Sequence, residues 1–148
     1  MFQILIVEDQ PAEIRLLREA FREAKAPHQL HIVQDGDDAL RFLHHEGGYS
    51  SAPRPDLILL DLNLPKKDGI EVLKDLKYDP QLQTVPVIVL TSSGSDTDIT
   101  NAYYHHANAY VQKPDNMDEY FELVRELELF WLGVVTMPPA SSKPKSGW

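Results

Sequence analysis

The chain has 148 residues, 43% hydrophobic and 25% charged, which is enough for one domain with its own core and too little for a second. It has no cysteine, so disulfides and thiol chemistry are excluded. Its formal net charge of −9 argues against a nucleic-acid partner, because binding to a phosphate backbone depends on clustered Lys and Arg. There is no long apolar run and no signal-peptide core after Met1, so we expect a cytoplasmic protein without a membrane segment.

Short apolar runs, typical of strands buried on both faces, alternate with segments of helical periodicity. The expected strands are 2–7, 30–33, 57–60, 86–91 and 109–112. The expected helices run from Pro11 to about Ala24, from Asp35 or Asp37 to just before Gly47, from Gly69 to Tyr78, from Ser95 past Tyr103, and from Asn116 to about Trp131. This alternation predicts an α/β fold, a parallel sheet with helices on both faces.

Acidic residues follow two of the expected strands. Glu8 and Asp9 come directly after 2–7, and Asp61 comes directly after 57–60. In a flavodoxin-like sheet of strand order 2-1-3-4-5, the first and third strands are neighbours, and ligands bind beyond their carboxyl ends. Three carboxylates at short range raise each other's pKa unless a cation accompanies them. Mg²⁺ is the expected cation, since it binds one or two carboxylates and leaves positions for phosphate oxygens.

Two further polar side chains follow strands at the same edge. Thr91 ends the run 86–91, and Lys113 follows the run 109–112. Taken singly, each is typical of a strand-end hydroxyl or a surface cation. Together with the three acids, however, they are better explained by one shared site than by polar residues that end strands independently.

The set also carries a family resemblance. Its members are Glu8-Asp9, Asp61, Thr91-Ser92 and Lys113-Pro114. In this order, at these strand ends, they closely resemble the receiver domain of two-component response regulators. The resemblance covers residues 1–131 and implies a flavodoxin-like, doubly wound five-stranded parallel sheet of order 2-1-3-4-5 with five helices. Residues 132–148 are rich in Pro, Ser and Lys, so we expect a partly disordered tail.

The resemblance implies that Asp61 accepts a phosphoryl group from a sensor histidine kinase. Asp9 and Asp61, with the main-chain carbonyl of Asn63, then correspond to the Mg²⁺ ligands of the family. Glu8 is expected to act mainly through metal-bound water. A carboxylate can serve as a covalent nucleophile, and charge stabilisation supplies most of the catalysis of phosphoryl transfer.

The resemblance also implies a switch. Lys113 is expected to pair with Asp61 or with the transferred phosphoryl group, and Thr91 to offer its hydroxyl to that group. Tyr110 stands where the family has an aromatic residue that rotates inward on activation. Phosphorylation would then shift an equilibrium between two arrangements of the face formed by the fourth helix, the fifth strand and the fifth helix.

The last helix predicts a further contact. Its apolar residues cover an arc of about 200°, wider than the roughly 100° that one core needs. We expect a homodimer to cover the excess, through that same face, with Tyr120, Phe121, Phe130 and Trp131 at the interface. The alternative is that the tail folds back through Val134, Val135 and Met137. The ending Phe130-Trp131-Leu132 and the turn 64–69 also resemble the response regulators that partner phytochromes.

The leading hypothesis is a single-domain phosphoacceptor that signals through protein contacts and is not an enzyme. A phosphatase or phosphotransferase with an aspartyl-phosphate intermediate is one alternative, but it needs a general acid two residues after the nucleophile, where Asn63 stands. The other is a receiver-like dimerisation module without phosphotransfer, which the intact Asp61, Thr91 and Lys113 disfavour.

Overall fold

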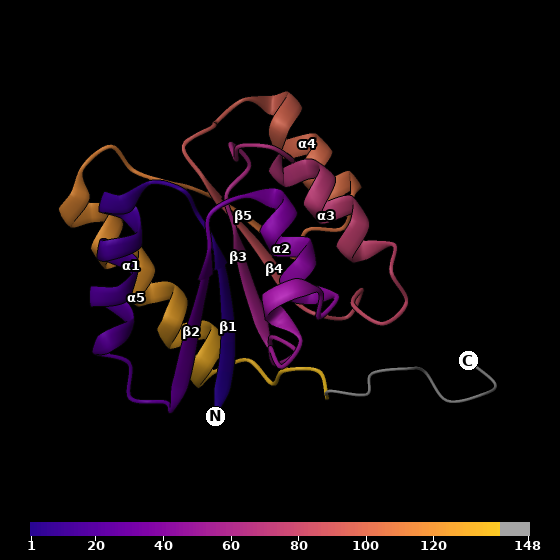
Figure 1. The fold of residues 1–148 in the computed structure, drawn as a ribbon. Coiled ribbons are helices and arrows are strands. Elements are labelled where there is room, and N and C mark those ends of the chain that lie inside the picture. The colour runs from indigo at the N-terminus through magenta and orange to yellow at the C-terminus, as the bar shows by residue number, and fades with distance from the viewer. Residues whose placement is uncertain (140–148) are drawn as a thin grey trace.

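A five-stranded parallel sheet lies at the centre of the molecule (Figure 1). The computed structural model describes residues 1–139, and its strands are β1 (Phe2–Val7), β2 (His28–Val33), β3 (Leu57–Leu60), β4 (Val87–Thr91) and β5 (Ala109–Gln112). They lie in the order β2-β1-β3-β4-β5, and each neighbouring pair is parallel. The flavodoxin-like order predicted from the sequence is confirmed.

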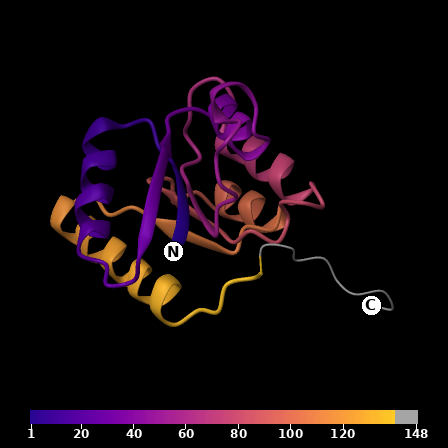
Figure 2. The same ribbon diagram turned by 60° about the horizontal axis from the view of Figure 1, so that its bottom comes forward.

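Helices cover both faces of this sheet. Within residues 1–139 they are α1 (Pro11–Arg22), α2 (Gly36–Leu43), α3 (Gly69–Lys77), α4 (Asp96–Tyr104) and α5 (Met117–Gly133), with a short 3₁₀ helix at Gly47–Tyr49. α1 and α5 pack together on one face, and α2, α3 and α4 lie on the other (Figures 1 and 2). None of these helices, in the range described, combines the length and apolar character needed to cross a membrane.

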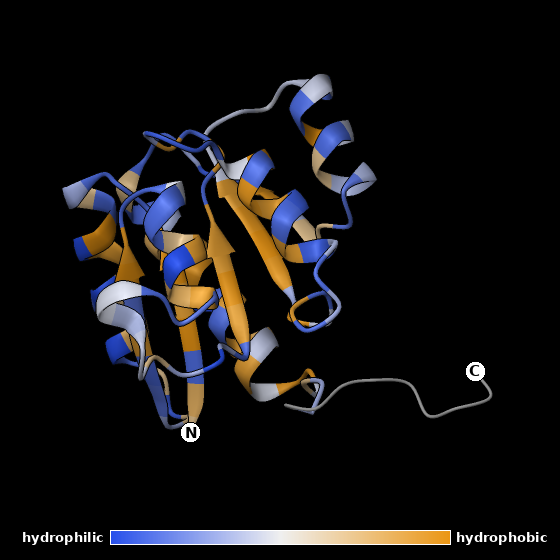
Figure 3. Cartoon of the chain, turned by 45° about the vertical axis from the view of Figure 1, so that its right-hand side comes forward, coloured by the Kyte–Doolittle hydropathy of each residue, from blue (hydrophilic) through white to orange (hydrophobic). Residues whose placement is uncertain are grey.

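The central strands are almost wholly apolar, apart from Gln3 in β1 and Thr91 at the end of β4, because both of their faces are covered. Successive side chains of a strand point to opposite faces, so Leu57 and Leu59 pack on the side of α1 and α5. Ile58 and Leu60 pack on the side of α2 and α3. In Figure 3 the strands in the middle of the sheet are accordingly mostly orange, whereas the helices carry both blue and orange residues.

Side-chain caps set where the helices begin. Asp35, rather than Asp37, caps α2, because its Oδ1 accepts a hydrogen bond from the main-chain N–H of Asp38 at 2.8 Å. Ser95 caps α4 in the same way, accepting from the N–H of Asp98 at 3.1 Å. Both caps lie in loops at the carboxyl edge of the sheet, so they also fix the loops that surround the candidate site.

Most element boundaries lie within two residues of those expected, and two of the differences concern β2 and α5. β2 begins at His28 rather than Leu30, because its polar first residues still pair with β1. α5 continues two residues past Trp131 to Gly133 and ends near the start of β1 (Figure 1). In the segment that follows, Met137 packs against the core on the side of α1 and α5. Of the three tail residues expected to fold back, Met137 thus contacts the core, whereas Val134 is 71% exposed. The disorder expected in its second half falls on 140–148, outside the described residues.

Candidate functional site

The polar residues predicted to share a site lie at one edge of the sheet, at the top of Figure 1. Asp61 directly follows β3, and its main-chain N–H donates to the carbonyl oxygen of Val7 in β1 at 3.1 Å. Lys113 directly follows β5, and its N–H donates to the carbonyl oxygen of Thr91 in β4 at 2.7 Å. The backbone ladder thus holds both residues one step beyond the sheet, where their side chains converge.

Lys113 is the centre of the polar contacts. Its Nζ lies 2.5 Å from Glu8 Oε1, 3.1 Å from Asp61 Oδ2 and 3.1 Å from Glu13 Oε2. The side chains of Lys113, Glu8 and Asp61 are only 5%, 3% and 8% exposed. An ammonium group has three N–H donors, so a different carboxylate can accept each one.

Burial and pairing shift the ionisation of this cluster. Burial raises the pKa of Glu8 above its usual range, and the hydrogen bond from Lys113 opposes part of that rise. Burial acts to lower the pKa of Lys113, but the hydrogen bond to Glu8 and its charge outweigh burial, so the pKa of Lys113 is raised. Lys113 therefore stays protonated at neutral pH and supplies a fixed positive charge beside Asp61.

The carboxylates of Glu8, Asp9 and Asp61 can hold a divalent cation. One oxygen atom from each lies within 4.8 Å of the others. Within the described part of the chain, Asp9 Oδ1 is buried and has no hydrogen-bond partner, so it is free to act as a ligand. Because hard divalent cations prefer oxygen ligands, these residues fit such an ion. Asn63 is exposed at the same edge, and its N–H donates to Asp61 Oδ1 at 3.3 Å.

A close backbone approach shapes the loop that follows Asp61. Gly69 begins α3 directly against this loop, and its N–H donates to the carbonyl oxygen of Leu62 at 2.9 Å. A Cβ at position 69 would overlap the carbonyl oxygen of Asp61 and the Cα of Leu62. A glycine is therefore required there to keep the main chain at Asp61 in place.

Thr91 and Tyr110 are linked through the loop that leaves β4. Thr91 is fully buried, and its Oγ1 accepts a long hydrogen bond from the N–H of Ser93 at 3.5 Å. Tyr110 is partly buried, and its hydroxyl donates to the carbonyl oxygen of Ser93 at 2.8 Å. Ser93 thus joins the two residues predicted to form the switch.

One of the residues expected at a dimer interface lies elsewhere. Tyr120 is 1% exposed and packs in the core between α5 and the sheet, so the prediction that it contacts a partner is wrong. Its ring lies 6.0 Å from Lys113 Nζ and forms the inner wall of the site. Of the other three, Phe121 and Trp131 are partly buried against the same core, and Phe130 is 51% exposed. Helical periodicity gave the apolar arc of α5 but not which part of it faces the sheet.

The site also contains a residue that the sequence analysis missed. Glu13 lies in the first turn of α1 and contacts Lys113 directly. The only signal in the sequence was its position four residues after Asp9, in the first turn of the expected helix, where an acidic residue is also favourable for the helix itself.

Comparisons with known proteins agree with this arrangement. The family model for the response regulator receiver domain matches residues 4–125. Response regulator Rcp1 of Synechocystis sp. is 47% identical over 137 residues, which are 93% of this chain and 93% of that protein.

Two solved structures are similar over most of their length. The crystal structure of the Mn²⁺-bound form of Rcp1 has a TM-score of 0.92 and 45% identity, and the match covers 94% of this chain and 100% of that one. The crystal structure of the phosphorylated cyanobacterial phytochrome response regulator RcpA has a TM-score of 0.91 and 47% identity, over 93% of this chain and 99% of that one.

Proposed function

Because this chain belongs to the response regulator receiver family, we propose that Asp61 accepts a phosphoryl group from a histidine kinase and that the protein signals through a changed interaction surface. The proposed kinase is a phytochrome, and the support for it is the similarity to the phytochrome response regulator RcpA along nearly the whole chain. The contact that carries the proposal is the 3.1 Å approach of Lys113 Nζ to Asp61 Oδ2 in a buried acidic cluster.

The residues at this edge fit the demands of phosphoryl transfer. A carboxylate oxygen of Asp61 attacks phosphorus, the P–N bond of a phosphohistidine breaks, and the imidazole nitrogen leaves with the bonding electron pair. Lys113 neutralises negative charge as the two anions approach each other. A bound Mg²⁺, held by Asp9, Asp61 and the carbonyl of Asn63, with Glu8 acting through water, would offset the remaining charge on the phosphoryl oxygens.

The proposed switch runs from the phosphoryl group to the outer face of α4, β5 and α5. Thr91 donates its hydroxyl to a phosphoryl oxygen, which draws the loop after β4 toward Asp61. Since Ser93 in that loop accepts from the Tyr110 hydroxyl, the position of the Tyr110 ring depends on the loop. The proposed output is a new arrangement of this face, at which Phe121, Phe130 and Trp131 contribute to a homodimer.

Intact-mass measurement after incubation with Mg²⁺ and acetyl phosphate tests this function. We expect one phosphoryl group per chain on the wild type and none on Asp61→Asn. Asp118→Asn, which removes an exposed carboxylate from α5, is the matched control and should be labelled like the wild type. An unlabelled wild type, or label retained by Asp61→Asn, would contradict the proposal, and continuous release of phosphate would indicate an enzyme instead.

A further inference from the structure

Glu13 contacts Lys113 in the site, but it has no role in the phosphoryl transfer proposed above. Its Oε2 accepts a hydrogen bond from Lys113 at 3.1 Å, the same distance as that between Lys113 Nζ and Asp61 Oδ2. All three N–H donors of Lys113 are therefore directed at carboxylates, from Glu8, Asp61 and Glu13. A phosphoryl oxygen on Asp61 can gain a donor from Lys113 only by displacing or sharing one of these contacts.

The three carboxylates are not equally easy to displace. Glu8 is buried and anchored, because its Oε2 also accepts from the main-chain N–H groups of Asp9 and Gln10 at 2.9 and 3.3 Å. Asp61 is the residue that carries the phosphoryl group. The Glu13 side chain is 22% exposed, so water can take the place of Lys113 when it leaves. Of the three carboxylates, Glu13 is thus the one whose contact with Lys113 costs the least free energy to break.

We propose that Glu13 is a positioning residue that holds Lys113 back from the phosphoryl group and so weakens the phosphorylated state. This inference rests on the proposed function, since it concerns the same acceptor site. While Glu13 is bound to Lys113, one donor of the ammonium is withheld from the anion on Asp61. Removal of Glu13 frees that donor and strengthens the contact of Lys113 with a phosphoryl oxygen.

The alternative is that Glu13 only stabilises α1, as acidic residues in a first turn do. Three substitutions separate contact from charge. Glu13→Asp keeps the charge and the helix preference but withdraws the carboxylate by about 1.5 Å, the length of one C–C bond. Glu13→Gln keeps an oxygen acceptor and loses the charge, and Glu13→Ala loses both. Glu19→Gln, an exposed carboxylate on the same helix paired with Arg22, is the matched control.

The experiment uses beryllofluoride, an anion that mimics the phosphoryl group on an aspartate, and measures its dissociation constant by ¹⁹F NMR with Mg²⁺ present. We expect Glu13→Asp and Glu13→Ala to bind it about threefold to tenfold more tightly than the wild type, as expected for one charge-assisted hydrogen bond no longer shared. Glu13→Gln should lie between them and the wild type, and Glu19→Gln should match the wild type. The Lys113 Nζ resonance, recorded without beryllofluoride, should shift in Glu13→Asp and stay unchanged in Glu19→Gln.

Each other outcome has a definite meaning. If Glu13→Asp binds like the wild type while Glu13→Gln binds more tightly, net charge and not contact is responsible, and the positioning role is overturned. If all variants match the wild type, Glu13 does not compete for Lys113, while the proposed function stands. If the wild type does not bind beryllofluoride, the proposed function fails, and this inference fails with it.

Discussion

Lys113 and Glu8 form a buried ion pair, with 2.5 Å between Nζ and Oε1, although the two residues are 105 positions apart in the chain. The pair joins the end of β5 to the end of β1, on either side of the β3 terminus that carries Asp61. Breaking a buried pair by removing one partner is costly, because the other charge is left without compensation. The pair that places a cation beside Asp61 is therefore also part of what stabilises the fold.

Lys113→Met should lower the free energy of unfolding by about 3 kcal/mol at pH 7.5, because Glu8 and Asp61 lose their cation. Burial already raises the pKa of Glu8, and without Lys113 nothing opposes that rise. A carboxyl group whose pKa is higher in the folded state stabilises the fold at low pH and loses that contribution as pH rises. The deficit should thus be smaller at pH 5.5, as urea denaturation at the two pH values can measure. Lys67→Met, which breaks a more exposed pair with Asp75, should cost under about 1 kcal/mol and change little with pH.

Mg²⁺ should stabilise the folded protein through the acidic cluster. A ligand that binds only the folded state adds about 1.4 kcal/mol at a tenfold excess over its dissociation constant, so the thermal midpoint should rise with Mg²⁺ concentration. Asp9→Asn should abolish this rise and should itself be more stable than the wild type without metal, because one of three crowded carboxylates is removed. Glu126→Gln, an exposed change on α5, should keep the response of the wild type. An equal rise for Asp9→Asn would mean that the ion binds elsewhere.

The sequence predicted the fold well where a short stretch determines the structure, and less well where distant segments meet. β3 is apolar at every position, and β4 is apolar up to its last residue, Thr91, because both faces of these strands are covered; this can be read from a few residues. Glu13 and Tyr120 enter the site only because α1 and α5 pack side by side next to Lys113. No local pattern distinguishes a first-turn acid or a core tyrosine from residues that line a site.

Gly69→Ala tests the close approach of the start of α3 to the main chain of Asp61 and Leu62. This approach, too, could not be predicted from the sequence. The added methyl group overlaps main-chain atoms rather than a flexible side chain, so the loop must move. We expect a loss of about 1–3 kcal/mol in stability, together with slower labelling by acetyl phosphate. Gly48→Ala is the control, because nothing lies within 4 Å of a Cβ built there. Denaturation and intact-mass time courses measure the two effects, and wild-type labelling by Gly69→Ala would show that the loop has room to adjust.

Phe130→Ser tests the proposed homodimer. Phe130 is 51% exposed on α5, and an exposed aromatic side chain at the centre of an interface often dominates its binding energy. We expect light scattering to show that the wild type dimerises. The dissociation constant of the variant dimer should be at least about tenfold higher, which corresponds to 1.4 kcal/mol. Tyr78→Ser removes an aromatic residue of similar exposure next to α3 and should leave the dimer intact. A wild type that stays monomeric at high concentration would contradict the dimer.

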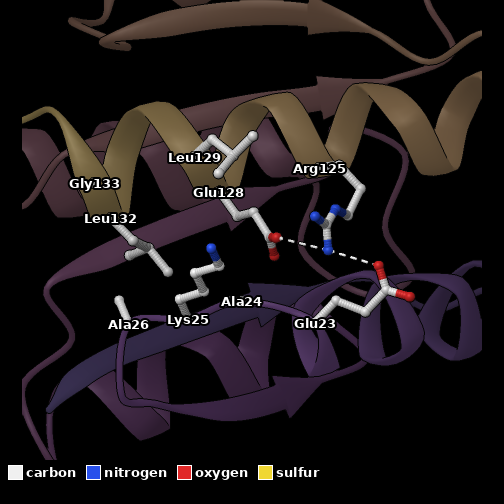
Figure 4. Close-up of a pocket in the computed structure, with 9 residues that line it drawn as sticks. All are labelled: Glu23, Ala24, Lys25, Ala26, Arg125, Glu128, Leu129, Leu132 and Gly133. Atoms are coloured by element: carbon white, nitrogen blue, oxygen red, sulfur yellow. Dashed lines mark hydrogen bonds and ion pairs between the residues drawn. The ribbon is translucent and has the colours of Figure 1, made fainter.

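A further buried carboxylate lies away from the site, between the end of α1 and the C-terminal half of α5 (Figure 4). Glu128 is 3% exposed and lines a cavity of about 250 Å³. Its Oε1 lies 3.3 Å from Arg125 Nη1, the same nitrogen that lies 2.7 Å from Glu23 Oε2. Within the described residues, neither oxygen of Glu128 accepts a hydrogen bond of normal geometry. The charge is therefore poorly compensated, and burial raises the pKa of Glu128.

Glu128→Leu should increase the free energy of unfolding by about 1 kcal/mol at pH 7.5, because replacing a poorly satisfied buried charge by an apolar side chain is often stabilising. The pKa of Glu128 is higher in the folded state than in the unfolded state. The wild type therefore loses stability relative to the variant as pH rises through the folded-state pKa. The gain should accordingly shrink at pH 5, and urea denaturation at both pH values measures it. Glu126→Leu makes the same change at an exposed position of α5 and should show no such pH dependence. A loss of stability in Glu128→Leu at both pH values would instead mean that the bridge from Glu23 through Arg125 to Glu128 holds α1 against α5.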